Sequence, residues 1–115
     1  MNVTGLAGFL LAKIAAAHRR RKDKDWYDIA FVLLHNDAGG PAQAATITRD
    51  RFGMELTGEI ATALDDLLAN FATPDAQGPA AYASQMVADH PNAEQAELRA
   101  DALLAVRAFH TGLFS

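Results

Sequence analysis

A lysine, a basic turn and two closely spaced carboxylates are the residues of this sequence that could do chemistry. Lys13 interrupts an apolar stretch, a basic run follows at 19–24, and Asp25 and Asp28 open the next apolar stretch. An ammonium beside guanidinium groups can bind a phosphate, and a carboxylate can orient that ammonium or contact a nucleophile. The same groups can form a structural salt bridge, and residue spacing by itself does not choose between the two.

Two helices must position these groups. Apolar periodicity predicts one helix from about residue 6 to about residue 19, and a second from about Asp23, as its N-cap, to about His35. A short connection favours antiparallel packing. At a rise of about 1.5 Å per residue, Lys13 lies about 10 Å before the turn and Asp28 about 7 Å after it. The two side chains should therefore lie at a similar level, where Lys13 either reaches water past its apolar neighbours or meets a partner.

The rest of the chain also favours helix. Alanine is abundant, and helix-breaking residues at 37–41, 73–75 and 90–91 divide the sequence. Four more helices are predicted: Pro41 toward Arg51, after Thr57, Gly78-Pro79 to Asp89, and from Pro91 or Asn92. We expect a single all-α domain over 1–115, a compact bundle of five to six short helices. Residues 1–36 form its motif-bearing antiparallel hairpin and 37–115 its helical tail.

Charge is divided sharply along the chain. Residues 1–24 hold six basic and one acidic side chain, whereas residues 25–115 hold four and thirteen, within a net charge of -4. A localised positive field suits a nucleotide phosphate, and the acidic remainder argues against a general nucleic-acid binder. On the tail, the adjacent Asp65 and Asp66 are expected on a solvated face.

Several classes are excluded by what the sequence lacks. There is no cysteine, so disulfides and thiolate sites are excluded. The four histidines show no H-x-x-x-H spacing, and we expect no metal site. Lys13 interrupts the single N-terminal apolar run, so we expect no membrane association and a cytoplasmic protein.

The arrangement of Lys13, the basic run 19–24 and Asp25-Trp26-Tyr27-Asp28 resembles the C-terminal half of the AbiEii/AbiGii-type nucleotidyltransferase toxins. These are bacterial abortive-infection and toxin–antitoxin proteins with a polymerase-β-like fold, and the resemblance covers about residues 5–35. It implies that Lys13 contacts the triphosphate of a bound nucleotide. It also implies that one of Asp25 and Asp28 is a catalytic residue in the active-site wall. The implied reaction is the Mg²⁺-dependent transfer of a nucleotide to an RNA or protein acceptor.

The basic run supplies the other phosphate contacts that this resemblance implies. They are Arg19, Arg21 and Lys24.

The sequence departs from the family in its other half. The family carries a Gly-Ser turn followed by an Asp-x-Asp pair that holds metal ions. Here neither Gly5 nor Gly8 is followed by such a pair, and Asp23-Lys24-Asp25 has no Gly-Ser ahead of it. We therefore expect a truncated or split C-terminal portion that contributes phosphate contacts. Such a portion would be inactive by itself and would need an N-terminal half to catalyse transfer.

A non-enzymatic helical interaction module is the alternative. The first predicted helix is apolar nearly all round, so a homodimer through it would cover that surface. The basic run at 19–24 could instead bind an acidic partner such as an antitoxin. Binding of nucleic acid by the same basic run is a third hypothesis, and it predicts an affinity that falls steeply with added salt.

Overall fold

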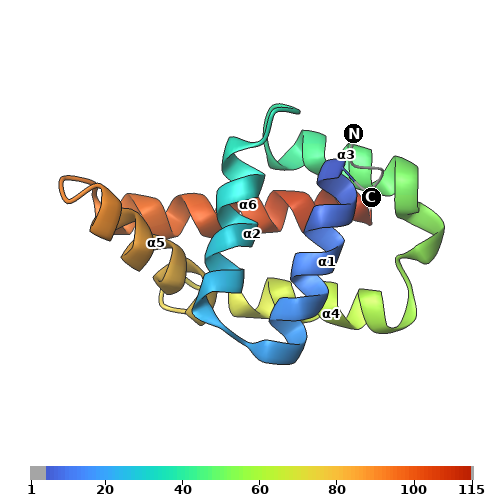
Figure 1. Cartoon of the computed structure of the whole chain (residues 1–115), viewed down its shortest axis with the longest axis horizontal. Helices are drawn as coiled ribbons and strands as arrows, with labels where there is room; N and C mark the ends of the chain where they lie inside the picture. Colours follow the sequence, from blue (N-terminus) through green and yellow to red (C-terminus); the bar gives the residue numbers. More distant parts are fainter. Residues whose placement is uncertain (1–4, 115) are drawn as a thin grey trace.

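The computed structural model describes residues 5–114, and these form an all-α bundle, as expected (Figure 1). Its helices are α1 (Gly5–Arg20), α2 (Asp23–His35), α3 (Pro41–Phe52), the 3-10 turn η1 (Gly53–Glu55), α4 (Gly58–Asn70), α5 (Gln77–Asp89) and α6 (Gln95–Leu113). No strand occurs within 5–114. No helix in this part of the chain has the length and apolarity needed to cross a bilayer.

Helices α1 and α2 form the predicted antiparallel hairpin and lie side by side in front of α6 (Figure 1). The connection is tight because Arg21 adopts a left-handed conformation, with φ of 55°. Its N–H donates to the carbonyl of Ala17 at 2.8 Å, which closes the C-terminus of α1. This two-residue turn fixes how the helices face each other.

The N-cap prediction for α2 was wrong. Lys22 occupies the N-cap position and makes no side-chain cap, while Asp23 is the first helical residue. The Asp23 carboxylate instead accepts a hydrogen bond from Gln77 of α5 at 3.0 Å. A tertiary contact has therefore replaced the local cap.

The C-terminus of α2 lies where the sequence predicted. The side-chain amide of Asn36 donates to the carbonyls of Val32 and Leu33, at 3.0 Å each. Its carbonyl accepts from the N–H groups of Ala38 and Gly39, at 2.9 and 3.1 Å. One side chain thus holds both the helix end and the turn that follows it.

Helix α6 runs behind the hairpin and contacts α2, α3 and α5 (Figure 1). Its start was predicted too early: residues 90–93 form a turn, in which Ala93 N–H donates to the carbonyl of His90 at 2.9 Å. The helix begins at Gln95 instead. The largest fully buried side chains of the core are Trp26, Tyr82, Phe71, Phe109, Leu10, Ile14, Ile29, Leu33, Leu64, Leu67 and Val106.

Candidate functional site

Lys13 meets both carboxylates of α2. Its Nζ lies 2.8 Å from Asp28 Oδ2 and 3.3 Å from Asp25 Oδ1. The expected common level of Lys13 and Asp28 across the hairpin is therefore confirmed. The side chains of Lys13 and Asp28 keep 23% and 18% of their surface exposed, whereas Asp25 keeps 3%.

Asp25 is held mainly by Arg20. Nη2 and Nε of Arg20 donate to Oδ1 and Oδ2 of Asp25 at 2.7 and 3.2 Å, a bidentate geometry. Burial by itself would raise the pKa of the Asp25 carboxyl, but hydrogen bonds from Arg20 and Lys13 outweigh burial and hold that pKa below its usual value. Asp25 is therefore ionised, and both of its carboxylate oxygens accept hydrogen bonds from cations.

Asp28 is the more accessible carboxylate. Besides Lys13 it contacts Lys24 at 3.4 Å, and the Lys24 side chain is 80% exposed. We call Lys13, Arg20, Lys24, Asp25 and Asp28 the Lys13 cluster. It holds three cations and two carboxylates, so it retains one formal positive charge. The hydrogen bond to Asp28 is the main reason that the pKa of Lys13 is raised.

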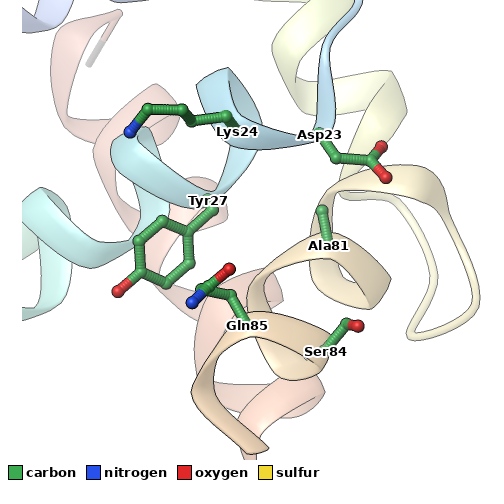
Figure 2. A pocket seen from close by; sticks show the side chains of 6 residues that line it. All are labelled: Asp23, Lys24, Tyr27, Ala81, Ser84 and Gln85. Carbon is green, nitrogen blue, oxygen red and sulfur yellow. The ribbon is translucent and has the colours of Figure 1, made fainter. Parts of the chain in front are cut away.

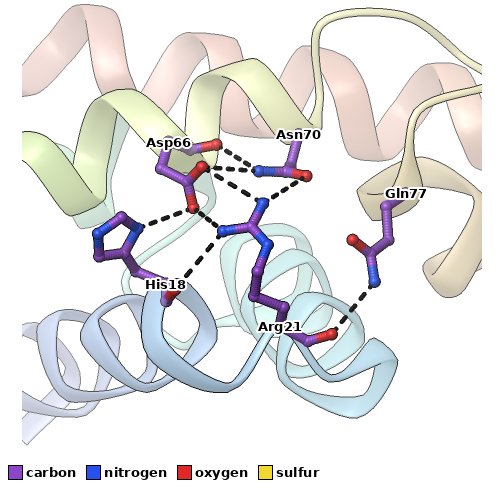
Figure 3. A network of polar contacts seen from close by, with 5 residues as sticks. All are labelled: His18, Arg21, Asp66, Asn70 and Gln77. Atoms are coloured by element: carbon purple, nitrogen blue, oxygen red, sulfur yellow. Dashed lines mark hydrogen bonds and ion pairs between the residues drawn. The ribbon is translucent and has the colours of Figure 1, made fainter.

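Arg21 points to a different group of residues (Figure 3). Its guanidinium donates to both oxygens of Asp66, at 2.9 and 3.4 Å, and to Asn70 at 3.3 Å. His18 Nδ1 lies 3.0 Å from the same Asp66. Gln77 of α5 donates to the Arg21 carbonyl at 3.3 Å.

The solvated face predicted for Asp66 was wrong. α4 packs against α1 and brings Asp66 beneath the turn of the hairpin, where it is half-buried. Burial would raise the pKa of the Asp66 carboxyl, but Arg21 and His18 lower it further than burial raises it. Asp65, by contrast, keeps 74% of its side chain exposed.

Arg19 is also separate from the Lys13 cluster. It is exposed and lines a hollow of about 690 Å³ between α1 and α4, together with Glu59. Of the four predicted phosphate ligands, the fold therefore brings only Lys13 and Lys24 together. Arg19 and Arg21 face α4.

A polar pocket of about 380 Å³ lies between α2 and α5 (Figure 2). Asp23, Lys24 and Tyr27 line it from α2, and Ser84 and Gln85 from α5. Figure 2 shows the Asp23 carboxylate and the Lys24 amine pointing to opposite sides, so their charges do not converge on one ligand. Hydrogen bonding to a neutral polar group is the chemistry that this pocket offers.

The residues described do not fit a magnesium site. Within 5–114 no group of three His, Asp or Glu side chains lies together as metal ligands would. Asp25 and Asp28 face cations rather than an open position.

Sequence reasoning missed Arg20 as a member of the site. A signal was present, because Arg20 lies seven residues after Lys13 and so projects from the same side of the helix. The basic run hid this signal, since four adjacent cations have no distinguishing pattern of their own.

No family model, curated protein or solved structure matches this chain.

Proposed function

We propose that this chain is the helical C-terminal portion of an AbiEii/AbiGii-like nucleotidyltransferase, and that the Lys13 cluster contributes contacts to the nucleotide phosphates. Transfer then depends on a second polypeptide segment that supplies the Gly-Ser and Asp-x-Asp elements, so the chain alone does not catalyse it. The proposal places the protein in the cytoplasm, where nucleoside triphosphates are found.

The uneven coordination of the two carboxylates supports this proposal. Arg20 satisfies Asp25 by itself, so the 3.3 Å contact from Lys13 is not needed to neutralise that group. Asp28 is partly exposed and is shared by Lys13 and Lys24. A phosphate can approach the two lysines from solvent and meet the excess positive charge, while Asp28 orients them.

Titration calorimetry with ATP at low ionic strength tests this proposal. We expect weak binding by the wild type and a loss of at least about tenfold in Lys13→Ala, because a charge-assisted contact is removed. The matched control is Lys22→Ala, which deletes an exposed lysine of the same turn and should bind as the wild type does.

Far-UV circular dichroism and thermal melting establish that each variant is folded. Arg20 still neutralises Asp25 in Lys13→Ala, so we expect that variant to fold. Equal ATP affinity in folded wild type and Lys13→Ala would rule out the phosphate contact.

A helical interaction module is the second candidate, supported by exposed aromatic surface on the hairpin. Helices α2, α3 and α4 cover one side of α1, but Phe9 keeps 39% of its surface exposed. A homodimer through α1 would bury this ring, and an antitoxin or an N-terminal half could do so instead. Phe9→Asp should convert such a dimer to a monomer in light scattering, whereas a strictly monomeric wild type would contradict self-association.

A further inference from the structure

One side of α2 carries Lys24 and Asp28 at one end and aromatic rings at the other. At 100° per residue, Lys24, Asp28, Phe31 and His35 lie within one narrow sector of the helix. Phe31 is 39% exposed, and its ring centroid lies 4.7 Å from that of His35, with 47° between the ring planes. Tyr27 contacts Phe31 from the preceding turn, with ring centroids 5.7 Å apart, so the three rings form a wall along α2.

This wall borders a pocket of about 340 Å³. Phe31, Val32 and His35 line it from α2, Leu6 from α1, and Ile47 from α3. The turn after α2 closes one end, and Asn36 holds that turn in place by the hydrogen bonds described above. The pocket thus has an aromatic wall and aliphatic side chains, and Asn36 and Asp37 of the turn give it a polar end.

The pocket lies at a fixed distance from the Lys13 cluster. Phe31 lies seven positions after Lys24 on α2, and Lys13 lies seven positions after Leu6 on α1. Because the helices are antiparallel, both counts place the pocket about 10 Å along the hairpin from the lysines. A nucleoside phosphate spans a comparable length between its base and its outer phosphates.

Resting on the function proposed above, we infer that this pocket binds the base of the nucleotide whose phosphates contact Lys13 and Lys24. The base stacks against Phe31, and His35 flanks it. Stacking of this kind accepts any base, because every base has a π face. The excess positive charge of the Lys13 cluster lies on the side toward which the phosphates extend. The negative charge of the ligand is therefore complementary to the charge of the surface.

Two probes separate base recognition from phosphate recognition: ATP and inorganic tripolyphosphate, each titrated without magnesium. We expect the wild type to bind ATP more tightly than tripolyphosphate. Phe31→Ala should weaken ATP binding by about five- to tenfold, as expected for a lost base–aromatic stack, and leave tripolyphosphate binding unchanged. Lys13→Ala should weaken binding of both probes.

The chain offers a closely matched control in α6 and the residue that follows it. Phe114 lies beside His110 with ring centroids 4.9 Å apart and 48° between the planes, and Phe114 is 48% exposed. Phe114→Ala removes an equivalent exposed ring from an equivalent pair and should leave ATP binding unchanged. Proton NMR adds a direct readout: the base protons of ATP should shift upfield with wild type and lose that shift with Phe31→Ala.

Each outcome decides between the two proposals. ATP binding that depends on Lys13 but not on Phe31 overturns the base pocket and leaves the phosphate contact standing. Loss of tripolyphosphate binding in Phe31→Ala also overturns the base pocket, because removing the ring would then have disturbed the fold rather than base stacking. A change of oligomeric state in Phe31→Ala with unchanged ATP binding would assign the surface to a second copy of the chain. No binding of either probe by the wild type overturns both proposals.

Discussion

The two carboxylates of α2 differ in role, although they lie three residues apart on one helix. Asp25 is 3% exposed and receives a bidentate contact from Arg20, whereas Asp28 is 18% exposed and contacts two lysines. An ionised group in the interior is tolerated when it is fully paired, and removing its charge leaves its partners without compensation. Asp25 therefore serves the structure, and Asp28 is the carboxylate that remains accessible to solvent.

At the residue scale, Asp25→Asn should lower the free energy of unfolding by about 2 kcal/mol, because it weakens a buried, charge-assisted network. Asp28→Asn should cost less, about 1 kcal/mol or below, because its partners are partly solvated. Urea unfolding followed by circular dichroism measures both. A larger loss for Asp28→Asn than for Asp25→Asn would contradict this division of roles.

At the element scale, one glycine sets how closely α5 approaches the end of α4. A Cβ at Gly78 would lie 2.3 Å from the ring of Phe71, which is itself 1% exposed. The ring also packs edge-on against Trp26 at a centroid distance of 6.3 Å. Because the ring is buried between Trp26 and Gly78, close packing of α2, α4 and α5 depends on the missing side chain.

Gly78→Ala should therefore destabilise the bundle by about 2 kcal/mol or more through overpacking. The matched control is Gly53→Ala, where a Cβ would meet only Arg49 Cγ at 3.7 Å and the backbone is already helical. That control should change the thermal midpoint little. Equal midpoints for the two variants would show that Phe71 can shift at low cost.

At the scale of the whole molecule, two buried or half-buried carboxylates hold the hairpin together and tie it to α4. Asp25 joins the two helices to each other, and Asp66 joins the turn between them to α4. Both have a pKa below the usual value for aspartate, because the hydrogen bonds they accept outweigh burial. Their contribution to stability is complete above the unfolded-state pKa of about 3.9, and it is lost as the pH falls through the lower folded-state values.

The free energy of unfolding should accordingly fall as the pH is lowered below about 4. The double variant Asp25→Asn/Asp66→Asn should be less stable than the wild type at pH 7 and should depend less on pH in the acid range. Asp50→Asn, at an exposed aspartate of α3, is the control and should keep the wild-type profile. Parallel pH profiles for the wild type and the double variant would contradict this assignment.

The helices and the Lys13–Asp28 contact were predictable because they depend on local rules. Apolar periodicity and breaker residues placed the helices, and the rise per residue with a short turn placed Lys13 level with Asp28. The N-cap of α2 and the start of α6 were less predictable. The Asp23 carboxylate accepts a hydrogen bond from Gln77 instead of capping α2. A turn over residues 90–93 moves the start of the last helix to a later residue.

Only the tertiary structure decided which cations share the Lys13 cluster and where the pocket bordered by Phe31 lies. Arg20 and Arg21 are adjacent and chemically identical, yet the left-handed backbone at Arg21 sends one to Asp25 and the other to Asp66, 45 residues further along the chain. The pocket likewise depends on α3, which brings Ile47 to the same pocket as Leu6 and Phe31. Such pairings come from the packing of distant helices, whereas a residue's position along its own helix follows from the sequence alone.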